Sequence, residues 1–129
     1  MNAWTPGWSE GPPLPLARAG YAAGVIADRY VVAGGTFWKG EKKIWSSRVD
    51  VFDSRFNTWS DGLPLPEPRA DAASATLDGA LYVIGGGDQN NVRSDVIMLR
   101  NGAWKRLRSA ALPEPRLYAI AVTVGEYIY

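Results

Sequence analysis

The sequence predicts an all-β protein, and three observations support that prediction. There are fourteen glycines and nine prolines among its 129 residues, a composition rich in turn formers. The apolar segments, such as residues 81–84 and 96–99, have the length of β-strands and are bounded by turn residues. No stretch keeps a helical apolar period for three turns. We therefore expect short antiparallel strands and no helix longer than about two turns.

The composition is that of a folded domain with little electrostatic bias. Hydrophobic residues make up 47% of the chain and charged residues 21%. Fourteen basic and thirteen acidic residues leave a net charge of +1, which gives no case for binding nucleic acid or an anionic membrane. Cysteine and histidine are both absent, so disulfides, thiolate nucleophiles, the usual general base and the usual transition-metal ligands are excluded. We expect no metal and no cofactor.

The sequence contains no recognisable targeting or membrane-spanning segment. Its first residues, MNAWTPGWSEGPP, lack a basic stretch followed by an apolar one, as a signal peptide would have. No run approaches the roughly 18 apolar residues of a membrane span. The localisation is not encoded here, and the cytoplasm is the default expectation.

Three tryptophans set the register of an internal repeat: Trp8, Trp59 and Trp104. They are separated by 51 and 45 residues. Each is followed by a proline-rich turn and then, after ten, ten and twelve residues, by an arginine. These arginines are Arg18, Arg69 and Arg116. The chain is therefore built from similar units of about 50 residues.

Further elements keep the same register. A stretch of small and apolar residues follows each arginine, and sixteen residues after the first two arginines begin the glycine pairs 34–35 and 85–86. Glycine tolerates the left-handed backbone that lets a chain leave a strand sharply. Nine residues before Trp59 and Trp104 stand Asp50 and Asp95, each opening a strand-like run. The glycine pairs are thus part of the repeat.

Repetition near 50 residues in an all-β chain is typical of a β-propeller. The glycine pair, the tyrosine-bearing strand before it and the spaced tryptophan resemble the kelch repeat over nearly the whole chain. The resemblance implies a kelch-type β-propeller segment of about two and a half four-stranded antiparallel blades. It spans residues 1–129, with units at about 8–58, 59–103 and, incomplete, 104–129. The second unit departs from the family in having Met98-Leu99 where Tyr-Asp is usual, followed by an Asn101-Gly102 hairpin turn.

Two other interpretations of the polar loops are weaker. A phosphate-binding glycine loop needs a following helix whose amides face the anion, and neither glycine pair is followed by a helical pattern. Four side chains near the second pair offer oxygen ligands for calcium, but their spacing is not that of an EF-hand. These are Asp88, Asn90, Asn91 and Asp95. We favour a solvated loop.

The tryptophans divide into two groups. Trp8, Trp59 and Trp104 recur in register, and we expect them to pack between sheets. Trp38 and Trp45 lie outside the register. They are therefore better candidates for a surface site.

The number of units also bears on assembly. Ring closure takes about four to eight blades, so about two and a half blades cannot close. Either the chain is a segment of a longer propeller, or copies associate through unpaired strand edges, most simply as two or three chains. Self-association is the expected behaviour of the chain alone.

The arginines that open the inner strands are the first candidate site. In the family, this position lies near the mouth of the central channel, so the resemblance implies that Arg18, Arg69 and Arg116 converge on a carboxylate ligand. The alternative is that each arginine caps a turn or pairs with a carboxylate of a neighbouring blade. The residues leave both interpretations open.

The second candidate site is the insertion at residues 36–48, which makes the first unit six residues longer than the second. It resembles kelch proteins of the bacterial sialic acid mutarotase type at Gly34, Gly35, Phe37, Lys42, Lys43 and Trp45. That resemblance implies that Trp38, Lys43 and Trp45, with the arginines, bind an acidic sugar such as N-acetylneuraminate. The candidate catalytic groups for opening and reclosing its ring are Glu41, Lys43 and Arg69.

Two functions therefore remain open from the sequence. The leading interpretation is a kelch binding or scaffold module that recognises a ligand or a protein through its loops and channel mouth, without chemistry of its own. The alternative is part of a carbohydrate-active propeller such as an N-acetylneuraminate mutarotase. Whether the chain is an enzyme is not decided by its residues.

Overall fold

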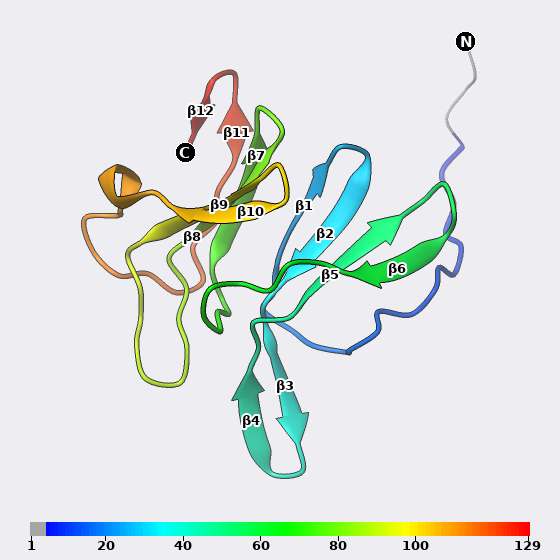
Figure 1. Ribbon diagram of the computed structural model, residues 1–129, viewed down its shortest axis with the longest axis horizontal. Helices are drawn as coiled ribbons and strands as arrows, with labels where there is room; N and C mark the ends of the chain where they lie inside the picture. The colour runs from blue at the N-terminus through cyan, green and yellow to red at the C-terminus, as the bar shows by residue number, and fades with distance from the viewer. Residues whose placement is uncertain (1–4) are drawn as a thin grey trace.

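The computed structural model describes residues 5–129, which form an all-β structure built on two four-stranded antiparallel sheets. The first sheet has the order β1-β2-β5-β6, and Figure 1 shows it beside the second. Its strands are β1 (Ala22–Ile26), β2 (Arg29–Ala33), β5 (Val49–Asp53) and β6 (Thr58–Asp61). In the second sheet the order is β7-β8-β9-β10, with β7 (Ala73–Leu77), β8 (Ala80–Ile84), β9 (Val96–Arg100) and β10 (Ala103–Arg106). The predicted four-stranded blades are confirmed.

Two hairpins complete the architecture. The insertion of the first unit forms β3 (Thr36–Lys39) and β4 (Lys42–Trp45), a separate two-stranded ribbon that projects from the first sheet (Figure 1). The start of the third unit forms β11 (Thr123–Val124) and β12 (Tyr127–Ile128). Within residues 5–129 the one helical element is a three-residue 3₁₀ turn, η1 (Arg108–Ala110). The expectation of no long helix is therefore confirmed for this part of the chain.

The strand connections contain residues that suit left-handed backbone. Asn101 and Gly102 join β9 to β10 with φ angles of 51° and 74°, as the predicted two-residue hairpin turn requires. Four residues join the equivalent strands β5 and β6 in the first sheet. This difference of two residues shifts the register between the two blades.

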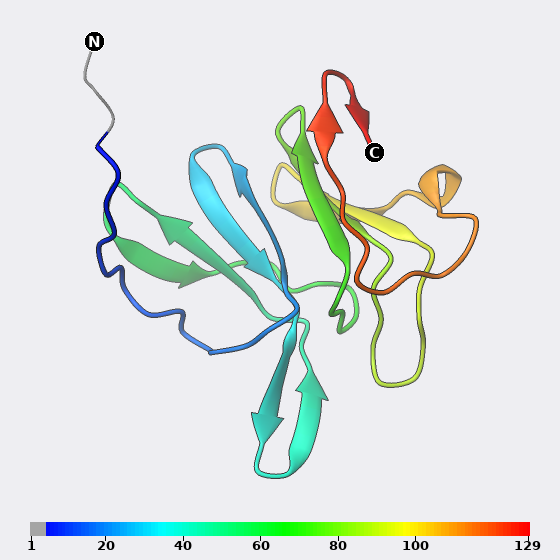
Figure 2. The same cartoon turned by 180° about the vertical axis from the view of Figure 1, so that it is seen from behind.

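The core lies where the two sheets meet, with the inner strand β1 packed on β7 and β8 (Figure 2). Small residues allow this approach: a Cβ on Gly24 would lie 2.6 Å from Cγ2 of Thr76. The Ser74 hydroxyl lies 3.2 Å from both the amide nitrogen and the carbonyl oxygen of Ala23. The buried cluster contains Ala22, Val31, Ala33, Val49, Leu65, Leu81, Val83 and Ile97.

Each glycine pair is the point where the next unit's arginine contacts the preceding blade. Gly34 and Gly35 have φ angles of 72° and 98°. The Gly35 amide donates a hydrogen bond to the Arg69 carbonyl at 2.8 Å, and the Gly86 amide donates to the Arg116 carbonyl at 2.8 Å. A Cβ on Gly34 would lie 2.1 Å from that Arg69 oxygen. The pair is therefore required for close approach of two chain segments.

The repeated tryptophans join neighbouring units where a sheet is present. Trp59 packs against Phe52 with ring centroids 5.2 Å apart, and its indole donates a hydrogen bond to the Pro12 carbonyl at 3.1 Å. Trp104 donates in the same way to the Leu63 carbonyl at 2.9 Å. Packing was also expected for Trp8, and this was wrong: its side chain is fully exposed. Trp8 precedes the first sheet and belongs to no strand of the described structure.

Two absences hold for residues 5–129. These residues contain no helix with the length and apolarity of a membrane span. They also contain no group of three or more acidic, histidine or cysteine side chains arranged to hold a metal ion.

Candidate functional site

Arg18 is enclosed by the first blade, with a side chain that is 0% exposed. Its Nη1 donates to Oδ2 of Asp50 at 2.7 Å, and its Nε donates to the Gly34 carbonyl at 2.6 Å. Asp50, also 0% exposed, accepts a second ion pair from Arg48 at 2.7 Å. The guanidinium therefore fastens the segment before β1 to β2 and β5, and it does not reach solvent.

Asp50 stays ionised although it is buried. Burial by itself raises the pKa of this carboxyl group, but hydrogen bonds from Arg48 and Arg18 outweigh burial and hold the pKa below its ordinary value of 3.8. The two guanidinium partners thus offset the cost of removing this carboxylate from water.

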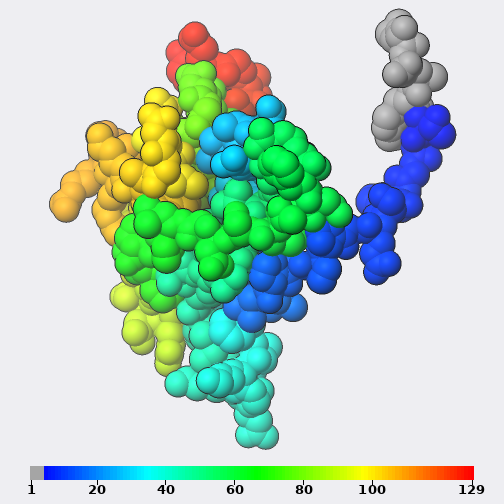
Figure 3. All heavy atoms as spheres, turned by 45° about the vertical axis from the view of Figure 1, so that its right-hand side comes forward, coloured from blue at the N-terminus to red at the C-terminus, as the bar shows by residue number. Residues whose placement is uncertain are grey.

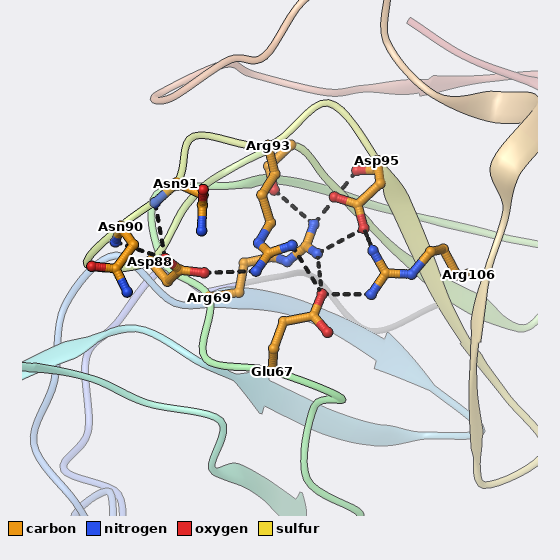
Figure 4. A network of polar contacts seen from close by, with 9 residues as sticks. Glu67, Arg69, Asp88, Asn90, Asn91, Arg93, Asp95 and Arg106 are labelled. Atoms are coloured by element: carbon orange, nitrogen blue, oxygen red, sulfur yellow. Dashed lines mark hydrogen bonds and ion pairs between the residues drawn. The ribbon is translucent and has the colours of Figure 1, made fainter.

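Arg69 takes the equivalent place in the second blade and is 1% exposed. Its Nη2 donates to Glu67 Oε1 and to Asp95 Oδ2, both at 2.9 Å, while Nη1 donates to the Gly85 carbonyl at 2.9 Å. Arg106 contacts the same two carboxylates, at 2.6 Å from Glu67. Figure 4 shows these side chains pointing toward one another. Burial raises the pKa values of Glu67 and Asp95, but the guanidinium groups hold both below the ordinary range.

The two networks place opposite charges at equivalent positions of the two blades. Gly62 donates to the Val49 carbonyl at 2.9 Å and Leu107 to the Val96 carbonyl at 2.8 Å, so β5 and β9 align with Val49 opposite Val96. Ile97 therefore occupies the position of Asp50, and Asp95 occupies that of Arg48. The pair Arg48–Asp61 of the first blade becomes Asp95–Arg106 in the second. Counting from the tryptophans equated Asp50 with Asp95, and the shorter β9–β10 turn makes that equivalence wrong by two residues.

The three arginines of the repeat do not form one accessible cluster. Arg18 and Arg69 pair with carboxylates of their own blades, and not with those of a neighbouring blade. The side chain of Arg116 is 61% exposed and pairs only with Glu114, at 3.1 Å, among the described residues. Of the three, Arg116 alone is exposed in the described part of the chain.

A cleft of about 310 Å³ lies between the β3–β4 hairpin and the loop at residues 87–93. These two segments come from neighbouring blades and project on the same side of the molecule in Figure 1. The space-filling view in Figure 3 shows the hairpin standing clear of the body. We call this the loop-face cleft; it is lined by Lys42, Lys43, Ile44, Trp45, Pro68, Asp88, Gln89, Asn90 and Asn91.

The hairpin wall of the loop-face cleft pairs a cation with an aromatic ring. Nζ of Lys43 lies 4.9 Å from the Trp45 ring centroid, within the range of a cation–π contact. Because Trp38 is the cross-strand partner of Lys43, it lies on the same face of the ribbon, and it is 66% exposed. The structure thus brings together three residues that the sequence singled out, although Trp38 does not line the cleft itself.

The opposite wall is organised by Asp88. Its Oδ1 accepts hydrogen bonds from the amides of Asn90 at 2.8 Å and Asn91 at 3.0 Å, and its Oδ2 accepts one from Arg93 at 2.6 Å. The hydrogen bond from the Asn90 amide, followed by that from Arg93, holds the pKa of Asp88 below its ordinary value. The amide residues of this loop, Gln89, Asn90 and Asn91, line the cleft. The sequence interpretation treated these residues as a solvated loop; the Asp-x-Asn-Asn pattern of an Asx turn was the available signal.

The candidate catalytic residues do not meet. Lys43 lines the loop-face cleft, but Glu41 lies exposed in the turn of the hairpin and outside the cleft lining. Arg69 follows the cleft residue Pro68 and turns its side chain into the buried ion network. An acid and a base on either side of a bound sugar are therefore not assembled from these three groups.

Comparison with known proteins identifies the repeat. The family described as Kelch motif matches residues 68–109, which span all four strands of the second sheet. The chain belongs to the kelch-repeat family. Alpha-scruin of Limulus polyphemus is 27% identical over 136 aligned positions, covering 100% of this chain and 14% of that protein. Kelch-like protein 35 of Homo sapiens is 32% identical over 90 positions, covering 70% of this chain and 15% of that protein.

A solved structure confirms the kelch fold. The structure of YjhT superposes with a TM-score of 0.86 at 16% sequence identity, covering 98% of this chain. The match covers 47% of the YjhT chain, so this kelch chain spans about half of that structure. The chain is a kelch-repeat module, and kelch repeats generally mediate protein interactions.

Proposed function

We propose that the chain is a protein-binding kelch module that holds an acidic segment of its partner at the loop-face cleft, without catalysing a reaction. The observation that carries the proposal is the pairing of Lys43 with Trp45 at a cleft between projecting segments of two blades. Tryptophan is among the residues that contribute most to protein interfaces, and an ammonium group favours a carboxylate partner.

The charge around the loop-face cleft supports an acidic ligand. Lys42 and Lys43 line the hairpin wall. Asp88 is the one acidic residue of the lining, and it already pairs with Arg93 at 2.6 Å. The lining therefore has an excess of positive charge, and such complementarity guides an acidic segment to the site.

An array of short peptides tests this proposal. Aspartate- and glutamate-rich peptides should bind the chain more tightly than the same peptides with asparagine and glutamine. Lys43→Ala should weaken the binding roughly ten- to a hundredfold, because one charged hydrogen bond is worth about 1.5–3 kcal/mol. Lys39→Ala is the matched control, since Lys39 lies on the same hairpin but not in the cleft lining. Equal binding of acidic and amide peptides would contradict the proposal.

An acidic sugar is a second candidate ligand. The half-buried Trp45 ring, the amide side chains of residues 89–91 and the size of the cleft favour it, since aromatic rings stack on sugar C–H groups. N-acetylneuraminate at millimolar concentration should then quench or shift tryptophan emission, and Lys43→Ala should reduce that response more than Lys39→Ala. Arg69→Ala is unsuitable for this experiment, because removing a buried ion-pair partner destabilises the fold. An unchanged emission spectrum would remove the sugar candidate.

The mutarotase alternative requires chemistry as well as binding. Interconversion of the N-acetylneuraminate anomers needs an acid and a base at the sugar ring. Because Glu41 lies outside the cleft lining and Arg69 is enclosed, we expect the chain to leave the rate of interconversion at its value in buffer. Nuclear magnetic resonance of the two anomers measures that rate. A faster rate that Lys43→Ala abolishes would favour the mutarotase alternative.

A further inference from the structure

The loop-face cleft runs along one edge of the β3–β4 hairpin. Its lining contains the four consecutive residues of β4, whose side chains alternate between the two faces of the ribbon. A cleft that contacts residues of both faces lies beside the edge of the strand. Across it stands the loop at residues 87–93 of the next blade (Figure 1). Both walls lie inside the chain, since β4 leads into β5 and the loop joins β8 to β9.

The edge of β4 at this cleft carries backbone groups that point outward. On the far edge of the hairpin, Thr36 exchanges two hydrogen bonds with Ala19, at 2.7 and 2.9 Å, so its amide and carbonyl point away from β4. Thr36 and its partner Trp45 therefore form a non-hydrogen-bonded pair of the ladder. Because such pairs alternate, Lys43 and its partner Trp38 form the next one. The amide and carbonyl groups of Trp45 and Lys43 accordingly point away from β3, toward the cleft.

The chain covers this edge only beyond the end of β4. The Ser46 carbonyl accepts a hydrogen bond from the Arg69 amide at 3.2 Å, and the Ser47 carbonyl accepts one from the Leu65 amide at 2.9 Å. Within residues 5–129, the outward backbone groups of Lys43 and Trp45 have no hydrogen-bond partner, and β4 pairs with β3 alone. These amides and carbonyls are therefore available to a further strand.

The side chains along this edge indicate what a further strand should carry. Lys43 and Trp45 lie two residues apart, on the same face of the ribbon. An acid suits the position opposite Lys43, and an apolar residue suits the position opposite Trp45, because cross-strand neighbours of these kinds stabilise a sheet. Asp88, the one acid of the cleft lining, is already paired with Arg93 and does not oppose a second acid.

We propose that the acidic segment of the partner binds as an extended strand that adds antiparallel to β4, with its acid opposite Lys43 and an apolar residue opposite Trp45. This inference rests on the proposed function and specifies its partner: an extended stretch in which the apolar residue stands two positions before the acid. Strand addition of this kind draws its affinity from backbone hydrogen bonds and its specificity from alternate side chains. The amide residues 89–91 line the other side of the added strand.

Two amidated hexapeptides of identical composition test the spacing of the side chains. In Ser-Val-Thr-Glu-Thr-Ser the valine and the glutamate lie on one face of a strand, whereas in Ser-Thr-Val-Glu-Thr-Ser they lie on opposite faces. Each peptide carries an N-terminal fluorescein, and its fluorescence anisotropy is measured as the chain is added. The first peptide should bind roughly two- to fivefold more tightly, the effect of one cross-strand neighbour.

Methylation of the peptide backbone separates strand pairing from contact through the acid alone. In the first peptide, a methyl group on the glutamate nitrogen removes an N–H that faces β4, and it should weaken binding at least about tenfold. A methyl group on the nitrogen of the preceding threonine, which points away from β4, should weaken binding less. Lys43→Ala should weaken the unmethylated peptide roughly ten- to a hundredfold, and Lys39→Ala should leave its affinity unchanged.

Hydrogen exchange of the chain, measured by nuclear magnetic resonance, locates the added strand. Saturation with the first peptide should slow exchange of the Lys43 and Trp45 amides roughly tenfold or more, because both become hydrogen-bonded. The Ile44 amide, which faces Phe37 inside the hairpin, should change little and serves as the control.

Each contrary result has a defined meaning. Equal weakening by the two methyl groups, or unchanged exchange at Lys43 and Trp45 in the saturated chain, would overturn the added strand. The proposed function would survive that result if Lys43→Ala still weakened binding. Absence of binding by any acidic peptide at millimolar concentration would overturn both. Exchange at these two amides that slows with rising chain concentration, without peptide, would overturn the proposal in favour of a second copy.

Discussion

The same arginine of the repeat has two different environments in this molecule. Arg18 and Arg69 are buried by carboxylates of their own blades, whereas Arg116 is exposed. Their sequence contexts are alike, since each follows a proline-rich turn. In the first two units a residue in or just before the third strand supplies an acid to this arginine, Asp50 in one and Asp95 in the other.

The first prediction concerns the stability supplied by Arg18. Arg18→Ala should lower the free energy of unfolding by about 3 kcal/mol, because it removes one guanidinium from the buried Asp50 while Arg48 remains. Arg116→Ala, at an exposed site, should cost less than about 1 kcal/mol. Urea unfolding followed by tryptophan fluorescence measures both. Similar losses for the two variants would show that burial does not distinguish these arginines.

The second prediction is a dependence of stability on acid. The pKa of Asp50 is lower in the folded chain than its ordinary value of 3.8, so the unfolded chain binds more protons in acid. Asp50 therefore contributes stability above about pH 4, and that contribution is lost as the pH falls through the folded pKa. Urea midpoints between about pH 7 and pH 2.5 should show a shallower acid decline for Asp50→Asn than for the unmodified chain. Parallel declines would contradict the assignment.

At the scale of elements, the glycines of the glycine pair and of the β3–β4 hairpin turn have different roles. Gly34 permits contact with the next unit, since its hydrogen atoms face the Arg69 carbonyl. Gly40, in the turn of the hairpin, also has a positive φ angle, of 62°, but no atom lies within 4 Å of its Cβ position. Replacing Gly40 by alanine therefore measures the free-energy cost of the backbone angle alone. Replacing Gly34 adds the cost of the lost close packing.

The third prediction uses this pair of glycines. Gly40→Ala should cost about 1–2 kcal/mol, the penalty of a left-handed backbone for a residue with a side chain. Gly34→Ala should cost more than about 4 kcal/mol or prevent folding, because the new methyl group would displace the Arg69 carbonyl and separate the two units. Thermal unfolding followed by circular dichroism compares them. Equal losses would mean that packing at the glycine pair contributes little.

Local patterns in the sequence were sufficient for the strands of the two four-stranded sheets, the hairpin turn at Asn101-Gly102 and the packing of Trp59. They were insufficient for contacts between elements. The insertion was identified as a loop of interest, but the pairing of Trp38 with Lys43 in a hairpin was not predicted. The register shift that exchanges Asp50 for Ile97 depends on a turn that is two residues shorter, and counting from the tryptophans cannot locate that deletion within the unit.

The sequence predicted one of the two walls of the candidate site. Lys43 and Trp45 were chosen from one unit, and they form one wall of the loop-face cleft. The other wall comes from the 87–93 loop of the next blade, and its position depends on how two blades pack. A repeat alignment within one chain gives the order of strands but not the distance between loops of neighbouring blades.

At the scale of the whole molecule, the exposed apolar residues gather at the third unit. They include Tyr118, Ile120, Val122, Val124, Tyr127 and Tyr129. Within residues 5–129 they make an apolar surface of the kind that favours association. The expectation of self-association remains a prediction, and this surface is the place to examine it.

The fourth prediction follows from that surface. The weight-average mass of the chain, measured by light scattering, should rise with concentration, and Ile120→Asp should reduce the rise. Val92→Asp places the same charge on an exposed apolar residue of the 87–93 loop and should leave the mass curve unchanged. A constant monomer mass at high concentration would contradict the prediction.

The central claim is that the loop-face cleft is the recognition surface of this kelch module. Amide chemical-shift mapping by nuclear magnetic resonance, with the tightest acidic peptide from the array, tests it most directly. We predict that the largest shifts fall at residues 42–45 and 88–91, the two walls of the cleft, and that they disappear in Lys43→Ala while Lys39→Ala retains them. Shifts confined to the third unit or to the outer strands β6 and β10, with none at the two walls, would contradict the claim.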